Sequence, residues 1–424
     1  MVYKIPTIVE DKISLDAKKL IEILDNFVEL KQKAKSLGLW NLFLSKDYRQ
    51  HQNGNRGLTT LEYAIMAEIM GKSIRIAPEA TNCSPPDTGN MEVFAKYGTP
   101  NQKEKWLKPL LNGEIRSAFA MTEKAMASSD ATNIQTSIKR VGNEYVINGH
   151  KWWISGAGDP RCAVYLVMGK SDFSSSDTKN NRHQQHSLVI VPANTPGIKI
   201  IRPMTVFGYD DAPEGHCEIV FTDVRVPVEN IMLGEGRGFE IIQGRLGPGR
   251  IHHCMRSIGM AERGLELMLL RVTDPSRRTF GKLLAEHGTI VSDIANARMA
   301  ERGLELMLLR VTDPSRRTFG KLLAEHGTIV SDIANAHWHG KGKKNNDSFL
   351  DLSIQAHGAA GLSVDFPLAY MYAIGRTLRI ADGPDEVHIQ QIGKLELRRS
   401  LEIKKFYEDR PKYNNNSDPM LSKL

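Results

Sequence analysis

Phe119-Ala120-Met121-Thr122-Glu123 opens the stretch around which the rest of the chain is arranged, and Trp152-Trp153-Ile154-Ser155-Gly156 closes it. Between them lie a hydroxyl-rich loop, Ser128-Ser129-Asp130, and two short alternating segments on either side of Asn148-Gly149. Because both residues of an Asn-Gly pair tolerate positive φ, the pair predicts a tight type I′ turn between two strands. Hydroxyl-rich loops beside a tryptophan suit a flat aromatic ligand with polar edges, although an ordinary hairpin with a core tryptophan accounts for the same residues.

These segments resemble the middle domain of the acyl-CoA dehydrogenases. The resemblance is closest to the branch called family members 10 and 11, without the extra N-terminal phosphotransferase-like domain of that branch. It implies that FAD binds here, with contacts from the loop and from the strand end: Phe119, Met121, Thr122, Ser128, Ser129, Trp153, Ile154 and Ser155. In that assignment Thr122 and Ser155 hydrogen-bond the edge of the isoalloxazine. Ser129 lies where FAD meets the CoA thioester and therefore also binds substrate.

The composition is typical of a globular protein: of 424 residues, 41% are hydrophobic and 25% are charged. This length can bury a large core and predicts two or three domains. No apolar run in the sequence is long enough to span a bilayer. The net charge is +7 and the pI is ≈ 9.0, but the charges are scattered. A basic enzyme with anionic ligands such as CoA or FAD is therefore favoured over a flavoprotein that binds nucleic acid.

The cysteines and the chain ends bear on the cellular compartment. Cys83, Cys162, Cys217 and Cys254 are far apart in sequence and form no Cys-x-x-Cys pair, so neither a zinc site nor a disulfide framework is expected. The N-terminal segment lacks the apolar core of a signal peptide and contains acidic residues, which argues against a matrix presequence. The sequence ends in Ser422-Lys423-Leu424, the tripeptide read by the peroxisomal import receptor. We expect a peroxisomal protein.

Residues 1–114 are predicted to form a helical N-terminal domain. Two capping patterns mark helix starts, Thr59 with Glu62 and Thr99 with Gln102. Asp87-Thr88-Gly89-Asn90 is expected to lie between two of these helices and also matches the family branch. Ordinary loop chemistry explains that motif equally well.

Residues 115–233 are predicted to form the middle β-domain, because the apolar period shifts to two. Short apolar runs predict strands at 163–168, 187–191, 198–201 and 218–224. The polar segment 170–186 is expected to be a surface loop. The glycine-rich segment from Gly234 to Phe239 lacks the glycine spacing and the surrounding βαβ pattern of a dinucleotide-binding fingerprint. It is expected to lead into a helical C-terminal domain, 234–410. A polar tail, 411–424, follows.

The C-terminal domain contains further motifs to which the resemblance gives roles. Arg250 matches an arginine near the active site and is expected to bind substrate. Arg277 and Phe280 match an Arg-x-x-Phe-Gly-Lys element that reaches the FAD of a neighbouring subunit. Gln355 and Gly358 match a backbone loop near FAD. His252-His253 is adjacent and so faces two sides of a helix, which makes a metal site there improbable; none is expected elsewhere.

An exact internal repeat interrupts this domain. Residues 260–297 recur without a change as 299–336. Structural repeats diverge, so a solenoid is not indicated. A recent exon duplication or an assembly error explains the identity. The second copy stands where the family has two long helices of the C-terminal bundle.

The candidate catalytic base is Asp382 in Ala381-Asp382-Gly383-Pro384, which matches the family's Tyr-Glu-Gly-Thr loop. Without the other motifs, Asp-Gly-Pro is typical of a turn. Burial raises the pKa of a carboxylate toward the range useful for removing an α-proton. The resemblance also implies that Gly383 contacts substrate and that Pro384 and Glu386 pack near FAD.

The predicted fold is therefore α+β and acyl-CoA dehydrogenase-like, with a helical N-terminal domain, a middle β-domain and a helical C-terminal bundle. The expected reaction is FAD-dependent dehydrogenation of an acyl-CoA to the trans-2-enoyl-CoA in fatty-acid β-oxidation. The electrons would pass to electron-transferring flavoprotein, or to dioxygen if the chain is an acyl-CoA oxidase. A homodimer or homotetramer is expected. An inactive FAD- or acyl-CoA-binding protein is the alternative of a different class, because the repeat displaces bundle helices.

Overall fold

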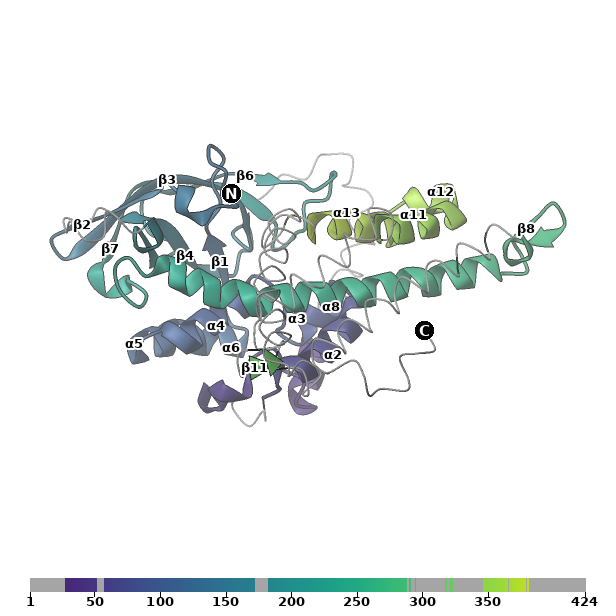
Figure 1. Ribbon diagram of the computed structural model, residues 1–424, viewed down its shortest axis with the longest axis horizontal. Helices are drawn as coiled ribbons and strands as arrows, with labels where there is room; N and C mark the ends of the chain where they lie inside the picture. Colours follow the sequence, from purple (N-terminus) through teal and green to yellow (C-terminus); the bar gives the residue numbers. More distant parts are fainter. Residues whose placement is uncertain are drawn as a thin grey trace, which may run out of the picture.

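The computed structural model describes residues 27–51, 57–171, 182–287, 290, 294, 346–364, 366–378 and 380, and the backbone of 317–318 and 321–322. A β-sheet occupies one end of the molecule, with short helices below it (Figure 1). One long helix, α8 (Gly238–Val272), runs from the sheet to the opposite end. This is the predicted order of helical, β and helical regions along the chain.

The N-terminal helices share a core with one face of the sheet and with α8. Both predicted capping boxes are present: the Thr59 hydroxyl accepts from the Glu62 N–H at 3.2 Å, and the Thr99 hydroxyl accepts from the Gln102 N–H at 3.3 Å. A capping box satisfies amide hydrogens that have no partner within the helix, so both starts are set by local sequence. The N-terminal elements are η2 (Lys46–His51), α2 (Thr60–Gly71), α3 (Ile76–Ala80), α4 (Asp87–Tyr97), α5 (Pro100–Gln102), η3 (Lys103–Leu107) and α6 (Lys108–Asn112).

Asp87-Thr88-Gly89-Asn90 is not a loop between helices. These residues form the first turn of α4, and all four are buried. The Asp87 carboxylate accepts hydrogen bonds from the N–H and the hydroxyl of Ser117, at 2.7 and 2.6 Å. Asn90 Nδ2 donates to the same hydroxyl at 2.9 Å. Polar residues that suit a loop therefore tie α4 to the sheet.

The middle region is a seven-stranded sheet with the order β1-β4-β2-β3-β7-β6, in which β5 pairs with β4. Its strands are β1 (Arg116–Ala120), β2 (Ser137–Val141), β3 (Glu144–Ser155), β4 (Cys162–Ser171), β5 (His186–Pro192), β6 (Ile198–Met204) and β7 (His216–Pro227). The four predicted apolar strands are confirmed as β4, β5, β6 and β7. One face of the sheet joins the helical core, and the other face encloses a second core within the β-region itself.

The predicted hairpin at Asn148-Gly149 is wrong. β3 runs through this dipeptide, and the hairpin turn lies earlier, at Gly142-Asn143 between β2 and β3. Asn148 and Asp223 of β7 exchange hydrogen bonds of 3.0 and 2.8 Å, and the register between β3 and β7 shifts here. A Cβ at Gly149 would collide with the side chain of Thr136. The dipeptide thus marks an irregularity in strand pairing and a close approach, because contacts from other strands override its turn preference.

α8 begins directly after the glycine-rich segment that was expected to lead into the C-terminal domain. It crosses α2 at Gly71 and Gly259, where a Cβ on either residue would strike the backbone of the other helix. Along its opposite side lie α11 (Asn346–His357), α12 (Ala359–Leu362) and α13 (Leu368–Leu378). Met260 of α8 shares a core with residues of α11 and α13. None of the described helices is long and apolar enough to cross a bilayer.

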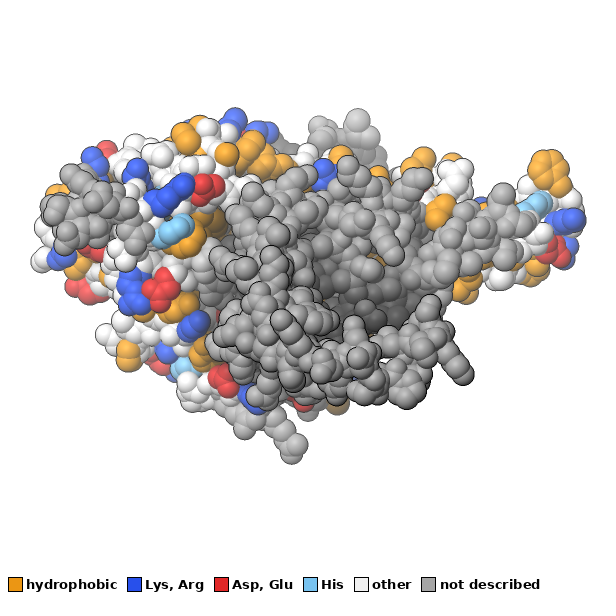
Figure 2. Space-filling view, in the orientation of Figure 1, with side chains coloured by type: hydrophobic (Ala, Val, Ile, Leu, Met, Phe, Trp, Pro, Cys, Tyr) orange, Lys and Arg blue, Asp and Glu red, His pale blue; other side chains and the backbone are white. Residues whose placement is uncertain are grey.

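A small hairpin follows α8 and projects beyond the body of the molecule (Figure 1). Its strands are β8 (Arg278–Thr279) and β9 (Lys282–Leu283). The second copy of the repeat forms the same hairpin from β10 (Arg317–Thr318) and β11 (Lys321–Leu322), with the equivalent register. Figure 2 shows hydrophobic, basic and acidic side chains together at the projecting end, and charges of both signs mixed over the β-region.

Candidate active site

A buried ion pair anchors the loop that follows β1. Lys151 of β3 is fully buried, and its Nζ lies 2.9 Å from Glu123 Oε1 and 2.7 Å from the Met121 carbonyl oxygen. The remaining bonds of Glu123 bind the far end of the loop: it accepts from the N–H groups of Gln135 and Thr136 at 2.9 and 2.8 Å, and from the Thr136 hydroxyl at 2.6 Å. Both ends of the loop 121–136 are therefore fastened to one carboxylate.

The electrostatics of this pair follow from its burial. Burial lowers the pKa of Lys151, while Glu123 opposes that shift by favouring the charged amine. For Glu123, burial acts to raise the pKa, but Lys151 and the hydrogen bonds from Thr136 and Gln135 outweigh it and the pKa is lowered. Removing either partner would leave a buried charge without compensation, which is far more costly than losing an exposed ion pair.

Thr122 joins this loop to the end of β3. Its carbonyl oxygen accepts from the Trp152 N–H at 3.1 Å, and its hydroxyl donates to the Trp152 carbonyl oxygen at 2.6 Å. The next residue, Trp153, has a φ of 55° and its side chain is 37% exposed. Left-handed backbone is uncommon for a bulky residue and is often found at binding sites. It leaves an indole partly open beside the Thr122 loop.

Ser155 ends β3 and meets a histidine that the sequence did not single out. Its Oγ lies 2.9 Å from Nδ1 of His216, the first residue of β7, and Nε2 of His216 lies 3.0 Å from Asp211 Oδ2. The ring centroids of His216 and Trp153 are 5.6 Å apart. The structure therefore brings Thr122, Trp153 and Ser155 together, with His216 behind them.

Other predicted cofactor contacts on the loop and strand lie differently. Phe119 is buried, with the Arg245 guanidinium 4.2 Å from its ring centroid. Ile154 is buried in the inner core of the sheet, so only its backbone can face a ligand. The Ser128 hydroxyl accepts from the Glu123 N–H at 2.9 Å, whereas Ser129 is exposed. Met121 is half-buried and offers its carbonyl oxygen to Lys151.

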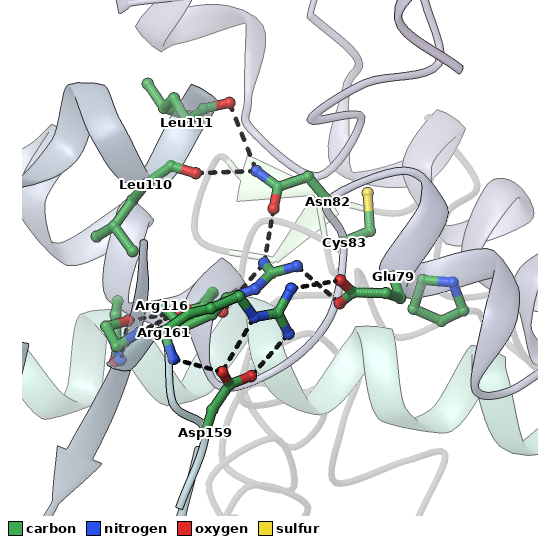
Figure 3. A network of polar contacts seen from close by, with 12 residues as sticks. Glu79, Asn82, Cys83, Leu110, Leu111, Arg116, Asp159 and Arg161 are labelled. Atoms are coloured by element: carbon green, nitrogen blue, oxygen red, sulfur yellow. Dashed lines mark hydrogen bonds and ion pairs between the residues drawn. The ribbon is translucent and has the colours of Figure 1, made fainter. Parts of the chain in front are cut away.

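A second charged network joins the helices to the base of this region (Figure 3). Arg116, the first residue of β1, is 2.7 Å from Glu79 of α3, and Arg161 approaches the same carboxylate at 3.0 Å. Asn82 and Asp159 supply further acceptors to the two guanidinium groups. Burial acts to raise the pKa of Glu79, but Arg116, Lys31 and Arg161 overcome it and lower the pKa to about 2. The network fixes the start of β1, and the site loop 121–136 follows the end of the same strand.

The described part of the chain contains no group of three or more His, Cys, Asp or Glu residues that could hold a metal ion. Among the described cysteines, Cys83, Cys162 and Cys217 are free thiols. His252 is buried against Tyr63, with their ring centroids 4.5 Å apart, so it has a packing role.

Three family models match successive parts of the chain. Residues 7–114 match the acyl-CoA dehydrogenase N-terminal domain, residues 118–224 the middle domain and residues 236–397 the C-terminal domain. The chain belongs to the acyl-CoA dehydrogenase family. Membership confirms the predicted fold and assigns the chain to a family of FAD-dependent oxidoreductases.

The similarity to individual acyl-CoA dehydrogenases extends over most of the chain. The probable acyl-CoA dehydrogenase IBR3 of Arabidopsis thaliana is 51% identical over 397 residues, which cover 88% of this chain and 46% of that protein. Acyl-CoA dehydrogenase family member 11 of Gallus gallus is 51% identical over 369 residues, covering 87% and 44%. A putative acyl-CoA dehydrogenase from Mycobacterium abscessus superposes with a TM-score of 0.78 at 43% identity, covering 88% of this chain and 87% of that one. The chain thus spans about half the length of these two curated relatives.

Among the predicted residues of the C-terminal region, those that the structure describes do not join the cluster around Trp153. Gln355 is exposed at the end of α11, and Gly358, with φ 59°, begins α12. Arg277 is exposed and pairs with Asp274 at 3.2 Å, and Phe280 is 93% exposed on the projecting hairpin. That hairpin and β3 lie at opposite ends of the molecule (Figure 1). Asp382, Gly383, Pro384 and Glu386 lie outside the described residues, as does the side chain of Arg250.

Proposed function

We propose that this chain is an FAD-dependent acyl-CoA dehydrogenase that converts an acyl-CoA thioester to the trans-2-enoyl-CoA. The observation that supports this most directly is the cluster of Thr122, Trp153 and Ser155, held in place by the buried pair of Glu123 and Lys151. Its aromatic face and hydroxyl groups meet at the end of a strand. Such a cluster suits a flat ring system with polar edges.

The residues present fit FAD. The partly open indole of Trp153 offers a flat apolar surface. The Thr122 hydroxyl, which donates to the Trp152 carbonyl oxygen, keeps oxygen lone pairs free to accept. Ser155, three residues along the same strand, offers a second hydroxyl. The buried anchors keep these groups in place before a ligand arrives, so little ordering entropy is lost on binding.

FAD, when bound, supplies the acceptor for the hydride that leaves the β-carbon of the substrate. The chain must supply the base for the α-proton, and we assign that role to Asp382. Helix α13 packs on the core that includes α8 and ends at Leu378, a short distance along the chain before Asp382. A carboxylate next to apolar groups has a raised pKa, which makes it a useful base.

We propose that the hairpin next to Arg277, which carries Phe280, contacts the FAD bound by a second copy of the chain. Both side chains are exposed. The hairpin projects at one end of the molecule, whereas β3, which carries Trp153, lies at the other end. A homodimer or homotetramer would bring the hairpin of one copy to the FAD of another. Arginine binds a pyrophosphate well because its planar fork reaches two oxygens at once.

The second candidate function is an inactive protein that binds FAD or acyl-CoA without turnover, because the second copy of the repeat, 299–336, occupies the sequence position of bundle helices in the family. Anaerobic addition of acyl-CoA thioesters to purified FAD-loaded protein decides between the two functions. We expect the flavin absorbance to bleach in the wild type. In Asp382→Asn the rate should fall by two to four powers of ten, with FAD still bound. Wild-type protein that binds FAD but does not bleach with any thioester would overturn the proposed activity, and bleaching at the wild-type rate in Asp382→Asn would overturn the assignment of the base.

The electron acceptor is proposed to be electron-transferring flavoprotein, with dioxygen as the alternative of an acyl-CoA oxidase. Hydrogen peroxide formed in step with turnover in air would identify the oxidase. We also propose a peroxisomal location from Ser422-Lys423-Leu424. Removing these three residues from a fluorescently tagged chain should change a punctate distribution to a diffuse one, and an unchanged distribution would refute the signal.

A further inference from the structure

A continuous chain of hydrogen bonds leads from the Trp153 cluster to α13. Ser155 Oγ lies 2.9 Å from His216 Nδ1, and His216 Nε2 lies 3.0 Å from Asp211 Oδ2. The other oxygen of Asp211 accepts from the Tyr370 hydroxyl at 2.9 Å. Ser155 and His216 are direct partners in the pairing of β3 with β7. The four residues come from two strands, a loop and a helix.

The direction of each hydrogen in this chain follows from the acceptor at its centre. Burial acts to raise the pKa of Asp211, but the bonds from His216 and Tyr370 outweigh it and lower the pKa, so the carboxylate is ionised and only accepts. Tyr370 therefore donates to one oxygen, and His216 Nε2–H donates to the other. A neutral imidazole with its hydrogen on Nε2 has only a lone pair on Nδ1. In that tautomer the Ser155 hydroxyl donates to Nδ1, which lies 2.9 Å away.

The surroundings keep this arrangement in place. The side chains of His216 and Asp211 are 17% and 14% exposed. Trp153 lies against the imidazole ring, and Arg75 lies over the ring of Tyr370, 5.3 Å from its centroid. Arg75 also donates to the carbonyl oxygen of Ala212, next to Asp211. These contacts favour an ionised Asp211 and an ordered ring.

We propose that His216 is a positioning residue that takes the hydrogen of the Ser155 hydroxyl, so that Ser155 meets the bound cofactor as an acceptor only. Asp211 selects the imidazole tautomer that makes this possible, and Tyr370 connects the same bonds to the helix that leads to Asp382. The inference rests on the proposed function. An acceptor-only hydroxyl bonds best to a cofactor edge that carries a hydrogen, and a flavin carries more ring N–H groups after reduction than before. His216 therefore favours reduced over oxidised FAD.

Two substitutions of His216 separate its two bonds. In His216→Asn the amide oxygen stands near the place of Nδ1, so an acceptor for Ser155 is kept while the bond to Asp211 is lost. In His216→Gln the amide nitrogen stands near the place of Nε2, so the donor to Asp211 is kept while Ser155 loses its acceptor. We expect the affinity for reduced FAD, relative to oxidised FAD, to fall about five- to tenfold in His216→Gln, as for one lost neutral hydrogen bond. His216→Asn should change this ratio much less.

The ratio is measured by anaerobic redox titration of the full-length FAD-loaded protein. A second readout needs neither FAD nor activity: long-range proton–nitrogen NMR of the imidazole in FAD-free protein, with the signal assigned by its loss in His216→Asn. We expect the tautomer with hydrogen on Nε2. A hydrogen on Nδ1, or equal redox shifts in the two His216 variants, would overturn the inference while leaving the proposed function intact. Wild-type protein that takes up no FAD would overturn the proposed function as well, and the NMR result would still report on the His216 bonds.

The link to α13 has its own matched pair. Tyr370→Phe removes the hydroxyl that bonds Asp211, and Tyr372→Phe removes a hydroxyl from the same helix without breaking this chain. We expect Tyr370→Phe to slow substrate-driven bleaching a few-fold at unchanged FAD content, and Tyr372→Phe to have no effect. Equal rates in the two variants would overturn the connection to α13.

Discussion

The loop 121–136 and the β8–β9 hairpin are both predicted to touch FAD, but they are held in different ways. The loop is fastened at both ends to Glu123, which is paired with the fully buried Lys151. The hairpin projects from the end of α8, and its Phe280 is 93% exposed. The first region is ordered by contacts within its own chain. The second has its predicted contact residues exposed to solvent, and in the proposed function a second copy of the chain gives them a role.

The internal repeat adds a control to this comparison. Residues 278–283 and 317–322 have the same sequence and form the same hairpin, so the hairpin is set by local sequence. Only the first copy continues directly from α8, whose Met260 packs with residues of α11 and α13. Identical residues can therefore have the same local structure but different places in the molecule.

The largest effect is expected from the buried pair. Lys151→Met should destabilise the protein by about 3–5 kcal/mol, because Glu123 is left buried without its partner. FAD retention should be lost with it. Urea unfolding, followed by fluorescence, measures the free energy of unfolding. The control is Lys139→Met on the exposed face of β2, which should change stability by less than about 0.5 kcal/mol. Equal stability of both variants would mean that the loop is not ordered by this pair.

The charged network below β1 should show a defined pH dependence. The pKa of Glu79 is lowered to about 2, so its contribution to stability is present above the ordinary carboxyl range and is lost as the pH falls toward 2. Glu79→Gln should therefore cost about 3 kcal/mol near neutral pH and less below pH about 4.

The matched control for Glu79→Gln is Glu144→Gln, which breaks an exposed pair with Arg225. An exposed pair contributes about 0–1 kcal/mol at most, so this variant should stay close to wild type. Unfolding curves measured between pH 3 and pH 7 give both costs. A constant cost of Glu79→Gln across that range would contradict the assigned pKa.

Substitution of the two repeat arginines tests whether position or local sequence decides function. Arg277→Ala should weaken FAD retention about tenfold or more, as expected for loss of a charge-assisted bond. Arg316→Ala should be near neutral for FAD retention. Arg277→Ala should not alter the free energy of unfolding of FAD-free protein, because Arg277 is exposed. FAD content after gel filtration provides the comparison. Equal losses would defeat the assignment to the first copy, and a larger loss in Arg316→Ala would reverse it.

The smallest effect is expected at the tip of the hairpin. Phe280→Ala should leave stability within about 0.5 kcal/mol, because the ring makes few contacts within its own chain. FAD retention should fall only a few-fold. Phe319→Ala in the second copy serves as its control. A marked loss of stability in Phe280→Ala, measured at a concentration where the chain is monomeric, would show that the hairpin is held by its own chain after all.

Predictions from the sequence were confirmed where interactions between residues close in sequence determine the local structure. Both capping boxes and the four apolar strands depend on residues a few positions apart, and the structure confirms them. The prediction of a turn at Asn148-Gly149 failed because its turn preference is local, whereas Thr136, directly before β2, and Asp223 of β7 contact it from elsewhere in the sheet. The polar residues of Asp87-Thr88-Gly89-Asn90 misled in the same way. Their partner, Ser117, is distant in sequence.

The candidate site also contains residues that the sequence predicted and residues that only the structure revealed. The motif residues Thr122, Trp153 and Ser155 were predicted from sequence as cofactor contacts, but the side chains that hold them in the structure were not. Glu123 and Lys151 stand directly beside those motifs, and a charged residue at a position where a strand should be apolar was the available signal. His216, Asp211 and Tyr370 had no such signal, because their meeting depends on the pairing of β7 with β3 and on the packing of α13.

By itself, the sequence determined the capped helix starts, the four apolar strands and the motifs that mark the family. Tertiary structure alone decided which carboxylate pairs with which buried cation, which hydroxyl meets which imidazole nitrogen, and which motif residues face solvent. The physical reason is one of range. Capping and hydrophobic periodicity act within a few residues of chain, whereas burial and ion pairing depend on groups that only the folded molecule brings together.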